Sequence, residues 1–247
     1  MNAASPSLRK TNRGWNSRIC EKFFLRSVFH KQIRQNTRAG FILDPGLIEN
    51  LIPGADLRSW PGNPQLQASG WSKTMFLRYA LAMHYGRGKT VLESCCGIGW
   101  GAYLLDSVTR RLVAVELDAP SLEIAKKVWP SRRTEHVRAT VLDLPFADRT
   151  FEMVTAIESI EHFSSIDLNR YLSEITRVLK PGGILVGSSS FPETSEEAEA
   201  ICAQNPNHLH IATRSEMIDR LSELGFVKIR IFNNRLFFTA RKKEIRG

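Results

Sequence analysis

Apolar and polar positions follow two alternating patterns along residues 73–224. Short, nearly continuous apolar runs predict buried strands, and helix-like segments lie between them. Strands of this kind that alternate with helices are typical of a parallel sheet covered on both faces. The predicted strands lie at residues 90–94, 112–116, 136–142, 151–156 and 184–188, and the predicted helices at 73–84, 121–128, 169–179 and 214–224.

The C-terminal part of the chain departs from this rhythm. Residues 226–232 and 235–241 read as two strands around Asn233-Asn234, a pair suited to the positive φ values of a two-residue turn. We therefore predict an α/β fold with a doubly wound, Rossmann-like, seven-stranded sheet whose last strand is antiparallel. The closing hairpin argues against a plain dinucleotide-binding Rossmann fold.

The N-terminal part of the chain has a different texture. We predict a basic arm at residues 1–40, with disorder up to residue 18 and an amphipathic helix at Ile19–Gln35. Residues 41–72 are rich in proline and glycine and predict a linker or lid, which leaves residues 73–247 as the main domain. The apolar face of the arm suits docking on that domain first and an anionic membrane surface second. A nucleic-acid arm and an organelle transit peptide stay open as further alternatives.

Composition narrows the class of protein. The chain has 247 residues, of which 43% are hydrophobic and 24% charged, so it can build a sizeable core and is not a disordered or collagenous protein. It contains no run of eighteen apolar residues, which excludes a helix across a membrane. The four cysteines form no CxxC pair, and this favours a reducing compartment, the cytoplasm, over a secreted disulfide scaffold.

The net charge of +9 is concentrated in the arm. Residues 1–40 hold nine basic residues against one acidic residue, so the rest of the chain is almost neutral. An RNA-binding groove would be basic around its own pocket, so the charge disfavours a nucleic-acid substrate.

A glycine-rich turn is the strongest local motif. The segment Val91–Gly101 is a strand that ends in Gly97-x-Gly99-x-Gly101 before a helix, where a ligand can approach the backbone. Glu116 ends the next strand, 17 residues past Gly99, where a carboxylate can accept hydrogen bonds from both hydroxyls of a ribose. Taken alone, Glu116 is equally compatible with a solvated acid at a strand end.

Two further segments complete an ordered set of four motifs. They are Asp143–Val154, with an acid and an apolar residue after the third strand, and Arg177–Val186, which contains Pro181-Gly182-Gly183. Together the four motifs resemble the class I S-adenosylmethionine-dependent methyltransferases, in the branch called methyltransferase domain 11, over about residues 75–240. The elements Ile160-Glu161-His162 and Asn205–His210 are similar to those of methyltransferases in glycan and small-molecule biosynthesis.

The resemblance implies a binding site for S-adenosylmethionine. Its residues here are Glu93, Cys95, Gly97 and Gly99 around the methionine part, Glu116 at the ribose, Asp143 and Leu144 at the adenine, and Glu158 near the sulfonium. The family usually has glycine where this chain has Cys95, so a Cβ is expected to crowd the cofactor there. We do not interpret Cys95 as a nucleophile.

The segment after the fourth strand bears on the acceptor. It has no Asp-Pro-Pro-Tyr-like element, which counts against methylation of the amino groups of nucleic-acid bases. It also has no Pro-Cys nucleophile, which counts against methylation of cytosine at C5. It reads instead Ala156–Phe163, in which His162 is a candidate general base toward a hydroxyl, with loop packing as the equal alternative.

A divalent-metal site is a further hypothesis. Glu158, Glu161 and His162 are spaced so that one helical turn puts them on one face. The spacing resembles the metal-binding element of small-RNA 2′-O-methyltransferases and some quinone O-methyltransferases, with His208 as the later histidine. The alternative is that Glu158 serves the cofactor alone and Glu161 is solvated.

These observations favour a methyltransferase that acts on a hydroxyl of a glycan or other small molecule. RNA 2′-O-methylation, with the metal site, is the first alternative. A non-catalytic module that uses the same fold for binding is the second.

Overall fold

The computed structural model describes residues 71–129, 131, 133–232 and 236–244. The predicted arm at residues 1–40 and nearly all of the predicted linker therefore lie outside the described residues. The helices are α5 (Trp71–Gly86), α6 (Trp100–Asp106), α7 (Ala119–Val128), the short 3₁₀ turn η2 (Ile160–His162), α8 (Ser165–Val178), α9 (Ser195–Cys202) and α10 (Arg214–Glu223). The strands are β1 (Thr90–Ser94), β2 (Arg111–Glu116), β3 (Thr134–Arg138), β4 (Phe151–Ile157), β5 (Leu179–Ser188), β6 (Phe226–Phe232) and β7 (Phe237–Lys242).

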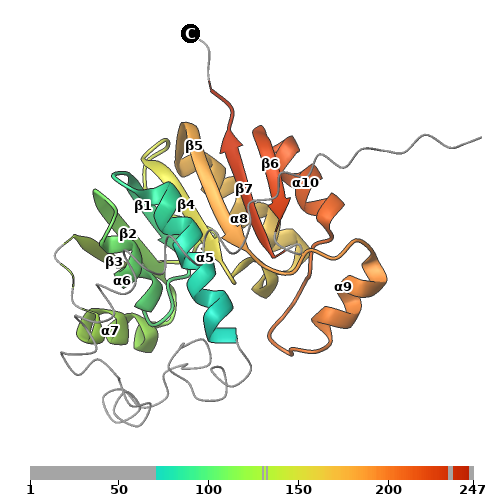
Figure 1. Cartoon of the computed structure of the whole chain (residues 1–247), viewed down its shortest axis with the longest axis horizontal. Coiled ribbons are helices and arrows are strands. Elements are labelled where there is room, and N and C mark those ends of the chain that lie inside the picture. Colours follow the sequence, from blue (N-terminus) through green and yellow to red (C-terminus); the bar gives the residue numbers. More distant parts are fainter. Residues whose placement is uncertain (1–70, 130, 132, 233–235, 245–247) are drawn as a thin grey trace, which may run out of the picture. The chain divides into compact units, whose positions relative to one another are not determined.

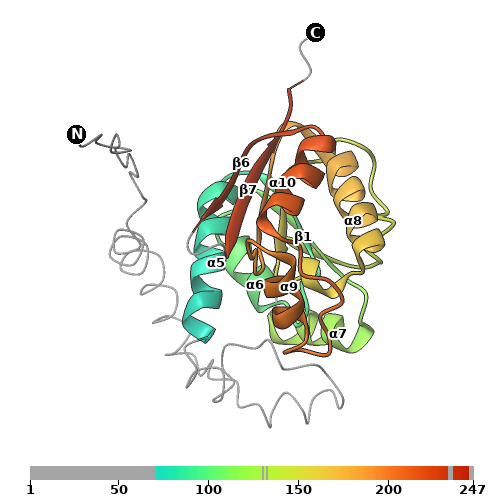
Figure 2. The same ribbon diagram turned by 90° about the vertical axis from the view of Figure 1, so that its right-hand side faces the viewer.

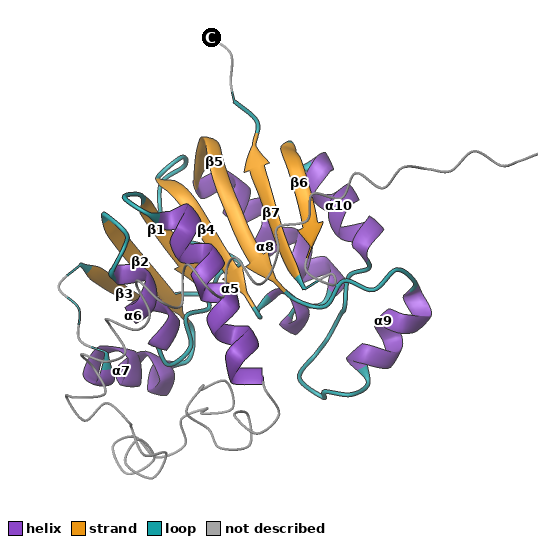
Figure 3. Cartoon of the chain, in the orientation of Figure 1, coloured by secondary structure: helices purple, strands orange, loops and turns teal. Residues whose placement is uncertain are grey.

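The seven strands form one sheet in the order β3-β2-β1-β4-β5-β7-β6, shown in Figure 1 and by element type in Figure 3. The strands from β1 to β5 are parallel, whereas β7 runs antiparallel to both of its neighbours, β5 and β6. This confirms the predicted fold class and the antiparallel last strand. The turn predicted at Asn233-Asn234 lies outside the described residues.

Helices cover both faces of the sheet. Figure 2 shows α5 on one side and α8 and α10 on the other. The apolar face of α8 is fully buried against the sheet because its apolar residues recur three and four positions apart. These residues are Leu168, Tyr171, Leu172, Ile175 and Val178.

The structure corrects the predicted third strand. We predicted a strand at residues 136–142, but β3 covers Thr134–Arg138 and the chain then turns. The turn is fixed because the Thr140 hydroxyl accepts a hydrogen bond from the Leu142 backbone N–H at 3.2 Å. Val141 is 5% exposed and belongs to the hydrophobic core, so its apolar character reflects burial in the core and not strand pairing.

Two other boundaries differ from the prediction. Pro181-Gly182-Gly183 was expected to precede the fifth strand, but β5 already begins at Leu179, which pairs with Phe151. The sequence pattern also missed α9, whose Thr194 side chain accepts a hydrogen bond from the Glu197 backbone N–H. Among the described residues, no helix has the length and apolar character that crossing a membrane requires.

Candidate active site at the carboxyl ends of the parallel strands

The loop between β1 and α6 turns through left-handed backbone conformations. Cys95, Gly97 and Gly99 have φ values of 57°, 54° and 83°. At Gly97, no atom of the described residues beyond its two chain neighbours lies within 4 Å of the position that a Cβ would take, so the backbone is open to a ligand. At Gly99, an added Cβ would lie 2.5 Å from the Cβ of Ala125, so this glycine lets α7 pack against the loop.

Glu116 is fixed beside this loop. Its Oε2 accepts a hydrogen bond from the Gly97 backbone N–H at 2.8 Å. Its Oε1 accepts hydrogen bonds from the backbone N–H groups of Leu117 at 2.8 Å and Asp118 at 3.0 Å. Leu117, which the sequence reasoning missed, is 60% exposed directly after the acid. A shallow depression of about 420 Å³ lies here, lined by Glu116, Leu117, Asp118, Ala119, Pro120 and Arg138.

Asp143 and Leu144 follow β3 at the same end of the sheet. The Leu144 backbone is held by α8, because its N–H donates to Glu174 Oε2 at 2.7 Å and its carbonyl accepts from Arg177 Nη2 at 2.9 Å. Leu144 is buried and Asp143 is exposed. The Asp143 carboxylate is therefore accessible at the rim of the site.

Glu93 lies under the loop with one unpaired oxygen. Its side chain is 2% exposed, and Tyr79 donates a hydrogen bond to Oε1 at 2.7 Å. Oε2 has no hydrogen-bond partner in the described part of the chain. Burial raises the pKa of Glu93 to about 8, while the bond from Tyr79 opposes that rise. Tyr79 comes from α5, and no sequence motif pointed to it.

The Cys95 thiol stays protonated in its surroundings. Burial raises the pKa of Cys95 far above the ordinary range, and the nearby Glu116 adds to the rise. A thiol needs a lowered pKa to act as a nucleophile at neutral pH. The chemistry of the site therefore agrees with the interpretation that Cys95 is not a nucleophile.

Replacement of Cys95 separates backbone strain from the loss of the thiol. Glycine adopts a φ of +57° without the steric cost that a Cβ carries. Both variants lose the sulfur, so they differ only in the Cβ. We therefore expect the free energy of unfolding of Cys95→Gly to be about 1 kcal/mol higher than that of Cys95→Ala. Denaturant unfolding measures the difference, and titration with the cofactor should give equal or slightly tighter binding for the glycine variant. A glycine variant that is less stable than the alanine variant would show that the side chain, not the backbone, decides this position.

Glu158 points toward a buried arginine. Its φ of 48° interrupts the helical turn on which we expected Glu158 and Glu161 to share a face, so that part of the prediction is wrong. Glu158 Oε1 lies 3.1 Å from Nε of Arg78 and accepts a hydrogen bond from Ser188 Oγ at 2.9 Å. Arg78, a residue of α5, is 6% exposed and was not found from the sequence.

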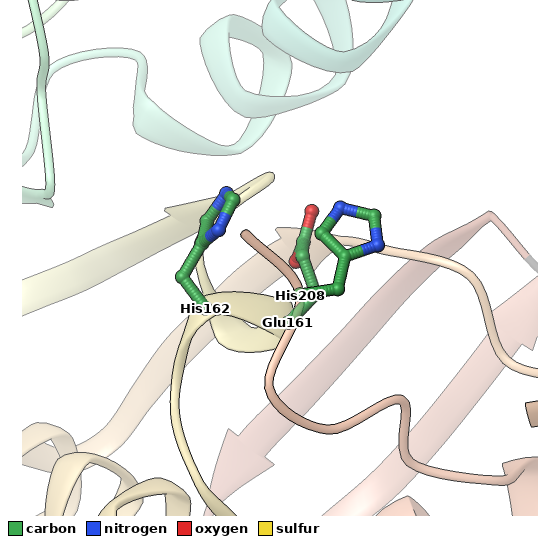
Figure 4. A group of neighbouring side chains, drawn as sticks. All are labelled: Glu161, His162 and His208. Carbon is green, nitrogen blue, oxygen red and sulfur yellow. The ribbon is translucent and has the colours of Figure 1, made fainter. Parts of the chain in front are cut away.

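Glu161, His162 and His208 converge next to this pair. One potential ligand atom from each side chain lies within 4.8 Å of the others, and Figure 4 shows Glu161 between the two imidazoles. The loop that carries His208 is attached to η2, because the Leu209 backbone N–H donates to the Glu161 carbonyl at 2.9 Å. The Asn207 carbonyl lies 2.9 Å from Nδ1 of His162 and can only accept, so Nδ1 carries the proton.

Two buried polar atoms in this cluster have no hydrogen-bond partner among the described residues. They are Oε2 of Glu161, which is 4% exposed, and Nδ1 of His208. Burial, followed by the charge of Glu158, raises the pKa of Glu161 to about 8. Burial and then the neighbouring His162 lower the pKa of His208. Both shifts keep the side chains neutral in the absence of a bound cation.

Comparisons with known proteins identify the family. A family model with the description "Methyltransferase domain" matches residues 92–187. The chain is 30% identical to a probable S-adenosylmethionine-dependent methyltransferase of Mycobacterium tuberculosis over 181 residues, which are 73% of this chain and 61% of that protein. The chain belongs to the class I S-adenosylmethionine-dependent methyltransferases. The predicted family, its cofactor and the assignment as an enzyme are thereby confirmed at the level of the family.

Two further similarities, one to a sequence and one to a solved structure, are more distant. A fatty-acid O-methyltransferase of Mycolicibacterium smegmatis is 29% identical over 124 residues, 47% of this chain and 44% of that protein. The crystal structure of the YcgJ protein of Bacillus subtilis aligns with a TM-score of 0.60 and 16% identity, over 68% of this chain and 99% of that one. The structural similarity supports the fold, and the acceptor is a matter for proposal.

Proposed function

We propose that this methyltransferase transfers a methyl group to a hydroxyl oxygen of a glycan or other small-molecule acceptor, with His162 as the general base. The orientation of the His162 ring carries the proposal. Because Nδ1 donates to the Asn207 carbonyl, Nε2 of the neutral ring keeps a lone pair for a proton. His162 is exposed at the carboxyl end of β4, where open α/β sheets bind their ligands.

S-adenosylmethionine, when bound, supplies an electrophilic methyl group on a good leaving group. Glu116 would accept hydrogen bonds from the ribose hydroxyls, and Asp143 from the adenine amino group. Gly97 leaves room for the methionine part beside the buried Glu93. When that methyl group passes to the acceptor oxygen, His162 Nε2 would accept the proton that the hydroxyl gives up.

The acceptor can be identified with a methyl-labelled cofactor. Incubation of the full chain with glycans, small alcohols and phenols, fatty acids and RNA should transfer label to a hydroxyl of a glycan or other small molecule. Label in RNA would support the RNA 2′-O-methylation alternative instead. Label in a fatty acid would indicate an acceptor like that named for the fatty-acid O-methyltransferase. Cofactor binding with no transfer to any class would favour the non-catalytic alternative. The cytoplasmic location and the role of residues 1–40 stay predictions of the sequence.

A divalent metal is a second proposal at the same site, favoured by the unpartnered atoms of Glu161 and His208. The residues that would hold it are Glu161, His162 and His208, since Arg78 and Ser188 already engage Glu158. Two imidazoles and one carboxylate suit Mn²⁺ and related ions, and also tolerate Mg²⁺. The ion would bind the acceptor oxygen and lower its pKa.

Stability as a function of pH tests the state of Glu161. With a folded pKa of about 8 and an unfolded pKa near 4.5, the folded chain binds the extra proton between these values. The free energy of unfolding should therefore fall as pH rises from about 4.5 to 8, by an amount on the order of 2–4 kcal/mol for this group. Glu161→Gln should remove this pH-dependent loss of stability. The variant should therefore be more stable than the wild type at pH 8 in metal-free buffer.

Added Mn²⁺ should reverse the comparison. A bound cation favours the carboxylate, so Mn²⁺ should raise the melting temperature of the wild type and leave Glu161→Gln unchanged. The exposed Glu123 of α7 gives a matched control, because Glu123→Gln should behave like the wild type. No effect of Mn²⁺ on the wild type, together with activity that survives a chelator, would reject the metal and leave His162 as a metal-free base.

A further inference from the structure

The strands β1 and β4 lie side by side in the sheet but separate at their carboxyl ends. Their pairing stops at Glu93 and Thr155, and the two chains then diverge. β1 continues to the glycine-rich loop, and β4 continues to η2 and α8. α5 and α8 lie on opposite faces here (Figure 2), so the divergence is the topological switch point of the sheet. The cofactor loop and the acceptor-side turn meet at this point.

A chain of hydroxyl groups crosses the gap between them. Ser94 Oγ donates to the Thr155 carbonyl at 2.5 Å and also shares a hydrogen bond with Tyr171 Oη. Tyr171 Oη lies 3.2 Å from Ser159 Oγ. Because the one proton of Ser94 is used on Thr155, Tyr171 donates to Ser94, and Ser159 then donates to Tyr171. Ser94, Tyr171 and Ser159 are each at most 2% exposed.

Both ends of this chain adjoin strained backbone in the site. Ser94 precedes Cys95, and Ser159 follows Glu158; Cys95 and Glu158 both have positive φ values. Non-glycine residues keep such conformations only where their surroundings hold them. Ser159 also comes directly before η2, which carries Glu161 and His162.

We propose that the Tyr171 hydroxyl is a positioning group that couples the cofactor loop to the acceptor-side turn. Through Ser94 and Ser159, a ligand on the loop changes the position of His162. The proposal rests on the proposed function, since it takes the loop after β1 as the cofactor site. A purely structural role, in which the hydroxyl only satisfies the two buried serines and the Cys95 thiol, would affect stability but not this response.

The test compares the wild type with Tyr171→Phe, which keeps the ring and its contact with Phe163 at 4.8 Å between centroids. The ligand is S-adenosylhomocysteine, and the readout is the NMR signal of the His162 imidazole, assigned with His162→Gln. In the wild type the ligand should shift this signal. In Tyr171→Phe the ligand should still bind, about fivefold more weakly at most, while the shift falls to about half or less. Ser159→Ala, which removes the other side of the link, should give the same loss.

Tyr85→Phe in α5 is the matched control and should retain the full response. If Tyr171→Phe does not fold, Ser159→Ala carries the test. A full His162 response in a variant that binds the ligand would overturn the coupling. No binding by the wild type would instead contradict the proposed function itself, so the two failures are distinguishable.

Discussion

Replacement of His162 by alanine is expected to lower turnover by about 10²–10⁴-fold, because a positioned general base contributes this much to proton transfer. Affinity for the cofactor should hardly change, since the ring contacts the Asn207 carbonyl and we propose that it serves the acceptor. The same loss is expected if His162 is a metal ligand. Methyl transfer to the acceptor found in the screen measures turnover, and calorimetry measures affinity.

His84 provides the control for this variant. It is an exposed histidine at the end of α5, next to the start of β1 and thus at the opposite end of the strand from the site. His84→Ala should keep full activity. A fully active His162→Ala would remove His162 from both the general-base and the metal versions of the mechanism.

Replacement of Glu116 by alanine is expected to weaken cofactor binding by about 1.5–3 kcal/mol, or roughly 10- to 100-fold. The variant loses the carboxylate that we propose accepts hydrogen bonds from the ribose hydroxyls. It also loses the bond that ties Glu116 to the Gly97 N–H at 2.8 Å, so the loop itself is less well held.

Glu135 on the neighbouring strand β3 gives a matched control for Glu116. It is an exposed acid that pairs with Arg111 away from the loop, so Glu135→Ala should bind the cofactor like the wild type. Unchanged affinity of Glu116→Ala would show that the ribose does not lie at this carboxylate.

Periodicity was sufficient for the fold because most of the strands are buried and read as apolar runs. It failed at residues 139–142, where Val141 is apolar because its side chain packs in the core from a turn. It also failed at α9, which buries only Ala198 and so shows little apolar signal. The antiparallel last strand followed from the closing hairpin. The order of the strands was not predicted beyond the doubly wound arrangement, and only the structure gives it.

The site was only partly predictable. Motifs and spacing identified Glu116, Glu161 and His162, because each stands at or just after the end of a strand. Arg78 and Tyr171 belong to helices on opposite faces, and only the packing of those helices brings them to the same strand ends. No sequence pattern indicated the left-handed φ of Glu158. The direction of the Glu158 side chain toward Arg78 therefore could not be predicted.

We propose that the loop after β1 and the acid at the end of β2 bind S-adenosylmethionine. Calorimetric titration of the wild-type chain with S-adenosylhomocysteine tests it most directly. One binding event per chain is predicted, and it should be strongly weakened by Glu116→Ala and preserved in Glu135→Ala. Absence of binding by the folded wild type would contradict the claim.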